Sequence, residues 1–395
     1  MNVPALRFKE FNGDWITKAL NEITGKIGDG LHSTPVYDEN GQYYFVNGNN
    51  LTNSKIEISE VTKRLNGNEY SKHKIELTPQ TILISINGTI GNLAFYNNEK
   101  VVLGKSACYL NLNQNENKYF VFNLLQTSKI KLHFDKELTG STIKNLSLTT
   151  IKNTKAYFPT LPEQTKIANF LTAVDDKITL LTKKADLLSQ YKKGVMQQIF
   201  SQELRFKDDD GQEFPEWEEK SLGDVAEINP KTDFLPEEFI YIDLESVEKG
   251  ILLKETRIRS DDAPSRAQRF LKKEDILFQM VRPYQGNNLF FDITGDYVAS
   301  TGYAQIRTME NPRFLYQSLH LENFTAEVMN RCTGTSYPAI NSSGLALILI
   351  TIPSLPEQTK IANFLTAIDE KITNNQTQLD AVKQYKQGLL QQMFV

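Results

Sequence analysis

The segment Leu161–Ala173 reads LPEQTKIANFLTA, and Leu355–Ala367 repeats the same thirteen residues 194 positions later. The two copies continue to match more loosely toward their ends, for example at Tyr191 and Tyr385. Chance does not produce such a match in a chain of 395 residues. A structural unit therefore occurs twice, and the rest of the sequence is interpreted around that duplication.

Both copies are predicted to be long helices. Thr160 with Glu163, and Ser354 with Glu357, fit a capping box at the first turn, where proline is also tolerated. About 38 residues at about 1.5 Å each would make a rod of roughly 57 Å. Apolar residues recur at alternating steps of three and four, which predicts a heptad seam. The seam residues are Ile167, Leu171, Val174, Ile178, Leu181 and Leu188 in the first copy and Ile361, Leu365, Ile368, Ile372, Leu379 and Val382 in the second.

The narrow seams favour two rods packed on each other as an antiparallel coiled coil, which would hold two globular parts at a set separation. The alternative is an ordinary amphipathic helix packed on its own domain. Lys192, Lys386 and Asn375 interrupt the seams and can fix their register. Gly194 and Gly388 fit either a close helix contact or kink, or simple fraying near the helix ends.

The parts that precede each helix also correspond, although more faintly. Leu6-Arg7-Phe8-Lys9 recurs as Leu204-Arg205-Phe206-Lys207, each followed by one of the two tryptophans, Trp15 and Trp217. The middles have diverged, and they show short strand-like runs between turn signals, with helices expected over about 117–134 and around 312–330. The sequence therefore predicts a mixed α/β (α+β) chain with pseudo-two-fold symmetry. Its parts are a first domain at 1–160, a helical spacer at 161–200, a second domain at 201–354 and a second spacer at 355–395.

Composition excludes several classes of protein. Hydrophobic residues make up 40% of the chain, so it can build real cores, yet it has no apolar run long enough to span a membrane. The start of the chain lacks the apolar region of a secretory signal, so a cytoplasmic location is expected. Only Cys108 and Cys332 occur, and the four histidines lack ligand spacing. Buried cysteines and no metal site are therefore expected.

The net charge of −4 is unevenly distributed. Residues 1–160 carry 18 − 14 = +4, and residues 201–354 carry 16 − 26 = −10. The two helical segments carry 6 − 4 = +2 and 4 − 4 = 0. A nucleic-acid partner of the second domain would therefore need a local basic patch, because the domain as a whole is acidic.

No motif for catalysis is present. Gly104-Lys105-Ser106 lacks the first glycine of a phosphate-binding loop, and Gly28-Asp29-Gly30 is not followed by the rest of a dinucleotide fingerprint. A nucleophile elbow and the Asn-Pro-Pro-aromatic tetrad of adenine methyltransferases are also missing. The chain is therefore not expected to be an enzyme by itself.

These residues resemble a known family. The Leu-Pro-Glu-Gln-Thr-Lys-Ile-Ala stretches at 161–168 and 355–362 resemble the start of the conserved helices in the specificity subunit of type I restriction–modification enzymes, the HsdS family. Leu-Arg-Phe-Lys followed by tryptophan resembles that family's domain entry. The stretches 27–35 and 276–284 resemble segments of its target recognition domains. The resemblance covers essentially the whole chain.

The resemblance implies a function. Each globular part would be a target recognition domain that reads one half of a bipartite site in double-stranded DNA. The helices would set the distance between the halves and dock two modification subunits, which carry S-adenosylmethionine and methylate adenine at N6. Two restriction subunits can join and add ATP- and Mg-dependent chemistry. This chain itself would hold no cofactor and no metal, and it would not contact a membrane.

Residue chemistry then suggests which side chains read DNA, because Arg, Lys, Asn and hydroxyl groups serve base edges and phosphates. About half of the arginines in the second domain could instead pair with Asp261, Asp262, Glu274 or Asp275, and each candidate in the first domain could be a plain surface residue. The candidates are Lys26, His32, Asn87, Thr89, Lys105 and Lys144 in the first domain and Arg257, Arg259, Arg266, Arg269, Arg282, Tyr284 and Tyr337 in the second.

Two other functions compete with this one. A non-catalytic coiled-coil adaptor without DNA specificity would use the same helices, but it would show no salt-dependent binding to duplex DNA. A stand-alone nuclease or methyltransferase is disfavoured by the missing motifs.

Overall fold

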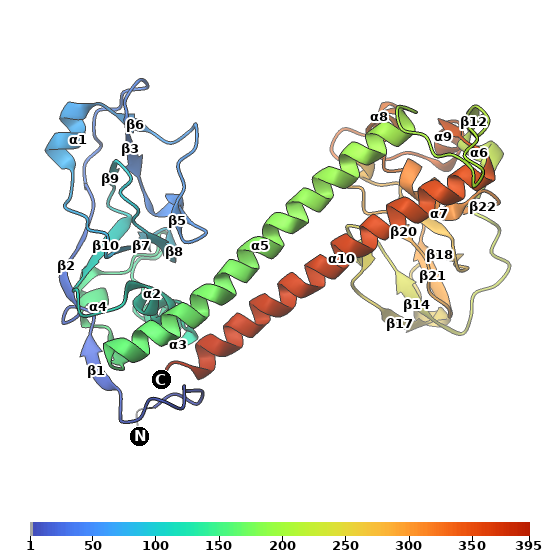
Figure 1. Cartoon of the computed structure of the whole chain (residues 1–395). Helices are drawn as coiled ribbons and strands as arrows, with labels where there is room; N and C mark the ends of the chain where they lie inside the picture. Colours follow the sequence, from blue (N-terminus) through green and yellow to red (C-terminus); the bar gives the residue numbers. More distant parts are fainter. Residues whose placement is uncertain (1–2) are drawn as a thin grey trace. The chain divides into compact units, whose positions relative to one another are not determined.

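The computed structural model describes residues 3–395, which group into two compact units (Figure 1). The first unit contains the residues up to Lys183 together with Thr377–Val395, and the second is Lys184–Gln376. Both boundaries fall inside the two long helices, α5 (Leu161–Phe200) and α10 (Leu355–Gln392). Each unit therefore holds one globular head, the start of one helix and the end of the other. The helices begin at the predicted residues.

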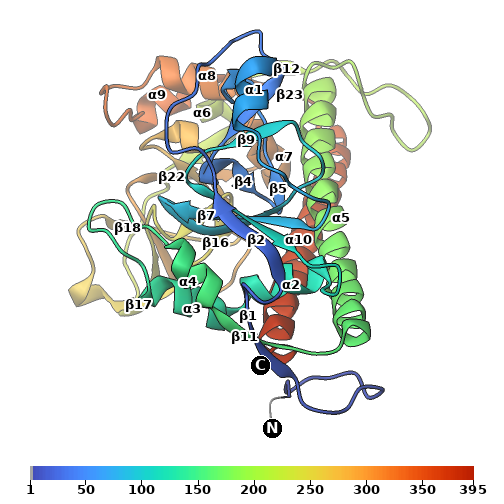
Figure 2. The ribbon, with the colours of Figure 1, turned by 90° about the vertical axis from the view of Figure 1, so that its left-hand side faces the viewer.

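The first head is built on a four-stranded antiparallel sheet in the order β2-β10-β7-β8. Its strand β7 is an apolar run that is buried from Thr81 to Ile86. A second sheet, β6-β3-β9, contains a parallel β3–β9 pair, and β1 pairs with β11 beside α5. In Figure 2 this head faces the viewer. Its strands are β1 (Ile16–Ala19), β2 (Thr24–Asp29), β3 (Tyr43–Val46), β4 (Leu51–Thr52), β5 (Lys55–Ile56), β6 (Arg64–Leu65), β7 (Thr81–Asn87), β8 (Thr89–Phe95), β9 (Val101–Leu103), β10 (Ala107–Leu112) and β11 (Lys155–Phe158), and its helices are the 3₁₀ turn η1 (Gly48–Asn50), α1 (Gly67–His73), α2 (Lys118–Gln126), α3 (Ser128–Lys136) and α4 (Leu148–Asn153).

The second head repeats this plan. Its sheet β13-β22-β19-β20 matches the first four-stranded sheet, β17-β14-β21-β18 contains the parallel β14–β21 pair, and β12 pairs with β23. Its strands are β12 (Glu218–Ser221), β13 (Ala226–Ile228), β14 (Glu238–Ile242), β15 (Val247–Glu248), β16 (Ile251–Leu252), β17 (Thr256–Arg259), β18 (Ala267–Phe270), β19 (Ile276–Gln279), β20 (Leu289–Phe290), β21 (Tyr297–Ser300), β22 (Tyr303–Thr308) and β23 (Leu349–Ile352), and its helices are α6 (Leu222–Val225), η2 (Ser260–Asp262), η3 (Pro283–Gln285), α7 (Pro312–Ser318), α8 (Glu322–Asn330) and α9 (Ser342–Ala346).

The helices expected over 117–134 and around 312–330 are each two helices. Thr127 ends α2, and its hydroxyl accepts a hydrogen bond from the Ile130 N–H at the start of α3, so it acts as an N-cap inside the predicted helix. Cys108 is fully buried in the first core, and burial raises the pKa of its thiol. Cys332 lies partly buried against the second core. Among residues 3–395, no helix has the length and apolar character needed to cross a bilayer.

Each hydrophobic core is completed by both long helices. In the first unit, Ile167 and Leu171 from the start of α5 pack in one cluster with Trp15 and with Leu389 and Met393 from the end of α10. In the second unit, the residues 194 positions away do the same, since Ile361 and Leu365 share a cluster with Val195 and Ile199. The start of one helix meets the end of the other, so α5 and α10 run antiparallel in each unit (Figures 1 and 2).

Two equivalent ion pairs join the helices. Lys386 Nζ lies 2.7 Å from Asp175 Oδ1 in the first unit, and Lys192 Nζ lies 2.6 Å from Asp369 Oδ1 in the second. Both lysines were predicted to fix the register of the seam. The predicted seam residues are buried or, at Ile178, Leu188, Ile372 and Val382, half-buried. The coiled coil is therefore shown by the contacts within each unit.

The glycines late in the helices do not mark a close contact within the chain. A Cβ placed at Gly194 or at Gly388 would meet no atom of the described chain within 4 Å. The helix α5 continues to Phe200 and α10 to Gln392, so neither glycine ends its helix.

Candidate nucleic-acid interface

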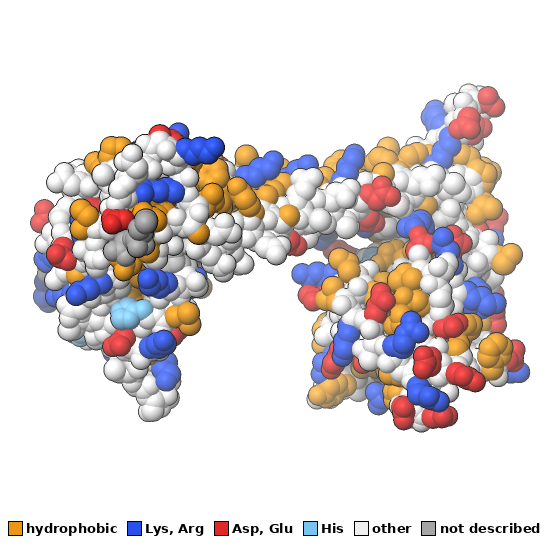
Figure 3. All heavy atoms as spheres, turned by 90° about the horizontal axis from the view of Figure 1, so that it is seen from below, with side chains coloured by type: hydrophobic (Ala, Val, Ile, Leu, Met, Phe, Trp, Pro, Cys, Tyr) orange, Lys and Arg blue, Asp and Glu red, His pale blue; other side chains and the backbone are white. Residues whose placement is uncertain are grey.

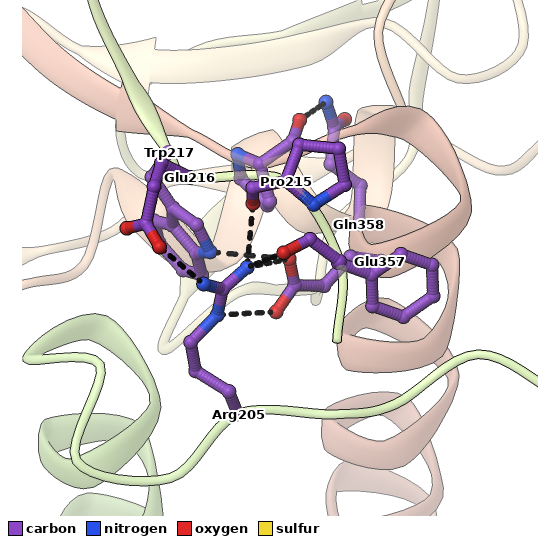
Figure 4. A network of polar contacts seen from close by, with 8 residues as sticks. Arg205, Pro215, Glu216, Trp217, Glu357 and Gln358 are labelled. Carbon is purple, nitrogen blue, oxygen red and sulfur yellow. Dashed lines mark hydrogen bonds and ion pairs between the residues drawn. The ribbon is translucent and has the colours of Figure 1, made fainter. Parts of the chain in front are cut away.

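A buried glutamate fixes each head to the helix that follows it. In the first unit Arg7 donates to the Glu163 carboxylate at 2.7 and 2.8 Å, and the indole N–H of Trp15 donates to it at 3.3 Å. The second unit repeats this group, which we name the glutamate latch, with Arg205, Trp217 and Glu357 (Figure 4). The hydrogen bond with Glu357 raises the pKa of Arg205. The latch explains why the arginine of Leu-Arg-Phe-Lys and the tryptophan recur before both helices.

The predicted capping box is therefore wrong in its contacts, although it locates the helix starts correctly. The carboxylates of Glu163 and Glu357 accept from Arg and Trp side chains and do not turn back to the backbone. The Ser354 hydroxyl has no hydrogen-bond partner in the described part of the chain. A charged, bidentate arginine is a stronger donor than a backbone N–H, so it takes the glutamate.

The glutamine after each latch glutamate anchors a loop of the head. Gln164 Nε2 donates to Glu116 Oε2 at 2.8 Å, while its Oε1 accepts from the Asn117 N–H at 3.0 Å. Gln358 makes the same bonds with Glu310 and Asn311. The Glu-Gln pair of the repeated motif thus holds each head on its helix.

In the first head, three of the candidate residues gather at one end of the four-stranded sheet, where the turn between β7 and β8 lies. Gly88 adopts φ +75° between β7 and β8, and its N–H donates to the Lys144 carbonyl at 3.2 Å. Asn87 is also bridged to Asn145. The structure therefore brings Asn87, Thr89 and Lys144 together, and we call residues 87–89 and 139–145 the first recognition edge.

Two more candidates lie next along that edge. The Lys105 N–H donates to the Leu31 carbonyl at 3.0 Å, and the Ile86 N–H donates to the Ser106 carbonyl at 3.0 Å. His32 follows Leu31, is 71% exposed and lies 2.7 Å from Asp29. Lys26 is different: it pairs with Asn111, which pairs with Thr81 at the far end of β7, so the structure does not bring Lys26 to this edge.

The second head repeats the edge at positions 194 residues later. The Arg282 N–H donates to the Pro338 carbonyl at 2.7 Å, and Val281 is bridged to Ala339, as Gly88 is bonded to Lys144 and Asn87 bridged to Asn145. The Arg282 guanidinium lies 4.2 Å from the centre of the Tyr337 ring. Tyr284 and Tyr337 are both exposed. We call residues 281–287 and 333–339 the second recognition edge.

The remaining four arginines do not lie together. The Arg266 carbonyl accepts from Thr301 N–H, and the neighbouring Gly302 carbonyl accepts from Met280 N–H, so Arg266 lies beside the second recognition edge. Arg257 and Arg259 belong to β17, and Arg259 pairs with the start of β14, which is the opposite end of that sheet from Arg266. Arg269 is half-buried in β18, and desolvation lowers its pKa.

The alternative that about half of these arginines pair with acidic neighbours is not supported among the described residues. None of Arg257, Arg259, Arg266, Arg269 and Arg282 forms an ion pair within residues 3–395. Asp275, which was expected to be one of the partners, is instead bound at 2.7 and 2.8 Å by Arg307. Acidic and basic side chains intermingle on the surface of this unit (Figure 3), so its cations are local features in an acidic head.

One group of candidate residues was missed from the sequence. The turn η1 lies beside Ser106, because the Gly48 N–H donates to Ser106 Oγ at 2.9 Å. This turn presents exposed Asn49 next to a shallow hollow of about 290 Å³, lined among others by Tyr37, Phe45 and Asn47. Asparagine can read adenine edges bidentately. The Asn-Gly-Asn-Asn stretch was recognisable as a turn, but its position at this edge depends on contacts with residues about sixty positions away.

Comparison with known proteins gives the family. A model described as type I restriction modification DNA specificity domain matches residues 12–190 and again residues 215–384. The chain belongs to this family. It is 26% identical over 340 residues to the type I restriction enzyme MjaVIII specificity subunit of Methanocaldococcus jannaschii, covering 80% of each chain. It is 31% identical over 194 residues to the HindI specificity subunit of Haemophilus influenzae, covering 46% of this chain and 41% of that protein.

Solved structures of the family share the fold. The S subunit of a type I restriction–modification system from M. genitalium aligns over 100% of this chain and 99% of its own, with a TM-score of 0.64 at 19% identity. A chain from a study of complex assembly and conformational transition of the type I R-M system aligns over 95% of this chain and 96% of its own, with a TM-score of 0.52 at 16% identity. The predicted fold class and family resemblance are confirmed.

Proposed function

We propose that this chain is the DNA sequence-specificity subunit of a type I restriction–modification complex, and that each head reads one half of a bipartite site. The observation that carries the proposal is the duplication itself. The family model matches both halves, and the two recognition edges have the same backbone contacts 194 residues apart but carry different side chains. Two readers with one scaffold and different surfaces suit two different half-sites.

The helix pair would set the spacing of the half-sites. Each head is fixed to its helix by a glutamate latch, and the two helices are joined by two buried seams and two ion pairs. Adding one heptad to both helices would extend the rod by about 10 Å, which corresponds to about three base pairs at about 3.4 Å each.

The exposed faces of the helices would dock two modification subunits. Several exposed residues are identical in both copies, although exposed positions are not constrained by the cores. They are Leu161/Leu355, Asn169/Asn363, Ala173/Ala367 and Tyr191/Tyr385. Figure 3 shows hydrophobic side chains exposed along the helices. A duplicated surface fits two copies of one partner, which would supply S-adenosylmethionine and the methyltransferase active site, while restriction subunits would supply ATP- and Mg-dependent cleavage.

The test is adenine methylation mapped at base resolution in cells that contain the modification subunit, with and without this chain. We expect one bipartite motif that appears only when the chain is present. A chimera that takes residues 3–160 from a relative of different specificity should change one half-site and keep the other. An adaptor without DNA specificity would leave the methylation pattern unchanged in both experiments, and that result would contradict the proposal.

A further inference from the structure

We propose that Arg282, stacked on Tyr337, is a DNA-contacting residue of the second head, and that its guanidinium binds a pair of acceptor atoms on DNA. The acceptors would be the O6 and N7 atoms of a guanine or two oxygens of a phosphate, which present the same chemistry to an arginine fork. This inference rests on the proposed function and names a residue that carries it out.

The first observation is the backbone of Arg282. It has φ +53° and ψ +54°, the left-handed conformation that side chains with a Cβ disfavour. The equivalent position in the first head is Gly88, which adopts φ +75° and needs no side chain to do so. Glycine would be the less strained residue at 282. A strained residue that carries a charged side chain at a binding surface indicates a use for that side chain.

The second observation concerns the contacts of the Arg282 guanidinium. Its Cζ lies 4.2 Å from the centre of the Tyr337 ring, and Tyr337 is itself 64% exposed. No hydrogen bond or ion pair engages the Arg282 side chain within residues 3–395. The contact with the ring does not use the N–H donors of the guanidinium, which leaves them for an external acceptor.

The third observation is that the surrounding loop is held in place from below. Gln279 is buried, and its Nε2 donates to the Val281 carbonyl and to Gln285 Oε1, each at 2.8 Å. Its Oε1 accepts from the Asn287 N–H at 3.1 Å. Gln279 is therefore a positioning residue that ties together both ends of the loop. A rigid loop directs Arg282 with little loss of entropy on binding.

The experiment compares the full chain with Arg282→Gly, Arg282→Lys and Tyr337→Phe, each assembled with the modification subunit. Binding is measured by anisotropy on the cognate duplex, on duplexes altered at each base pair of the second half-site, and on random duplex, over a range of salt. Arg282→Gly should unfold at the same or a higher temperature than wild type, yet bind the cognate duplex about ten- to a hundredfold more weakly. Tyr337→Phe should retain binding, because the ring remains.

The pattern of loss separates the two acceptors. If Arg282 binds guanine, Arg282→Gly loses discrimination at one base pair, and Arg282→Lys does not restore it. If Arg282 binds phosphate, binding weakens on every duplex, the slope of log K against log salt falls by about one, and Arg282→Lys restores part of the affinity. Both results support a DNA contact.

Arg259→Ala is the matched control. Arg259 is also exposed and forms no ion pair among the described residues, but it lies at the end of its sheet that is far from Arg282. The Arg259→Ala variant should bind every duplex as the wild type does. Wild-type affinity for every duplex in Arg282→Gly would overturn the inference. If the wild-type complex itself shows no preferred duplex, the proposed function fails instead, so the two failures are distinguishable.

Discussion

The two recognition edges share backbone contacts at equivalent positions but differ in loop length and side chains, whereas the two glutamate latches repeat the same side chains and the same bonds. Gly88 and Lys144 in the first head correspond to Arg282 and Pro338 in the second. The latches, by contrast, repeat Arg, Glu and Trp with the same bonds. The comparison teaches that the contacts that hold a head on its helix are separate from the surfaces that we propose to contact DNA. One scaffold can therefore accept new reading surfaces without losing its stability.

The largest effect should come from removing the end of α10, because it tests whether the first head depends on it. Deleting residues 389–395 removes Leu389, Met393 and Phe394 from the first core, where Phe394 packs edge-on against Trp15. Each such large side chain contributes about 2–5 kcal/mol, and together they approach the total stability of a domain at about 5–15 kcal/mol. We expect amide hydrogen exchange to show loss of protection in the first unit and its retention in the second. Equal protection in both units would contradict the core described above.

The next largest effect should come from breaking a latch. Glu163→Ala or Glu357→Ala leaves a half-buried arginine without its carboxylate, which should destabilise the protein by about 1–3 kcal/mol. Urea unfolding should show similar losses for the two variants, since the latches are equivalent. Glu10→Ala is the control, because Glu10 pairs with Lys166 at the surface, and it should unfold as wild type does. A large loss for one latch and none for the other would break the equivalence of the two heads.

A smaller effect, confined to the second unit, should appear at low pH. Burial lowers the pKa of His320, whose Nδ1 lies 2.8 Å from the Tyr316 carbonyl. The folded state therefore binds this proton less readily than the unfolded state, so the stabilisation is present above the ordinary pKa of about 6.5 and is lost as the pH falls below it. The first head carries Gln126 at the equivalent position. His320→Gln should reduce the difference between urea midpoints at about pH 7.5 and about pH 5; an unchanged difference would argue against this assignment.

The smallest effect should come from the helix glycines. Gly194→Ala and Gly388→Ala should each stabilise the isolated chain by about 1 kcal/mol, because the added methyl group meets open space and alanine favours a helix. Thermal unfolding measures this gain. The same variants should weaken assembly with the modification subunit if that partner approaches the exposed faces closely. Assembly at wild-type strength would place the docking surface elsewhere on the helices.

The duplication, the starts of both helices and the heptad pattern of apolar residues follow from the sequence alone. The match between the two copies and the heptad spacing are visible in the residues themselves, and Pro162 and Pro356 mark the first turn of each helix. The residue types at the recognition edges, such as Asn87 and Arg282, were also recognisable, because turn residues with polar side chains stand out in a sequence. The net charge of each segment likewise required no coordinates.

Only the tertiary structure decided which of these residues meet. Glu163 fits a capping box in the sequence, but Arg7, 156 residues earlier, takes its carboxylate. Lys26 and Lys105 look alike as candidates, yet the strand register places only Lys105 at the edge. The first core is closed by the last residues of the chain. The physical reason is that long-range contacts are selected by competition among many possible partners in a packed core, and local patterns carry no record of which partner wins.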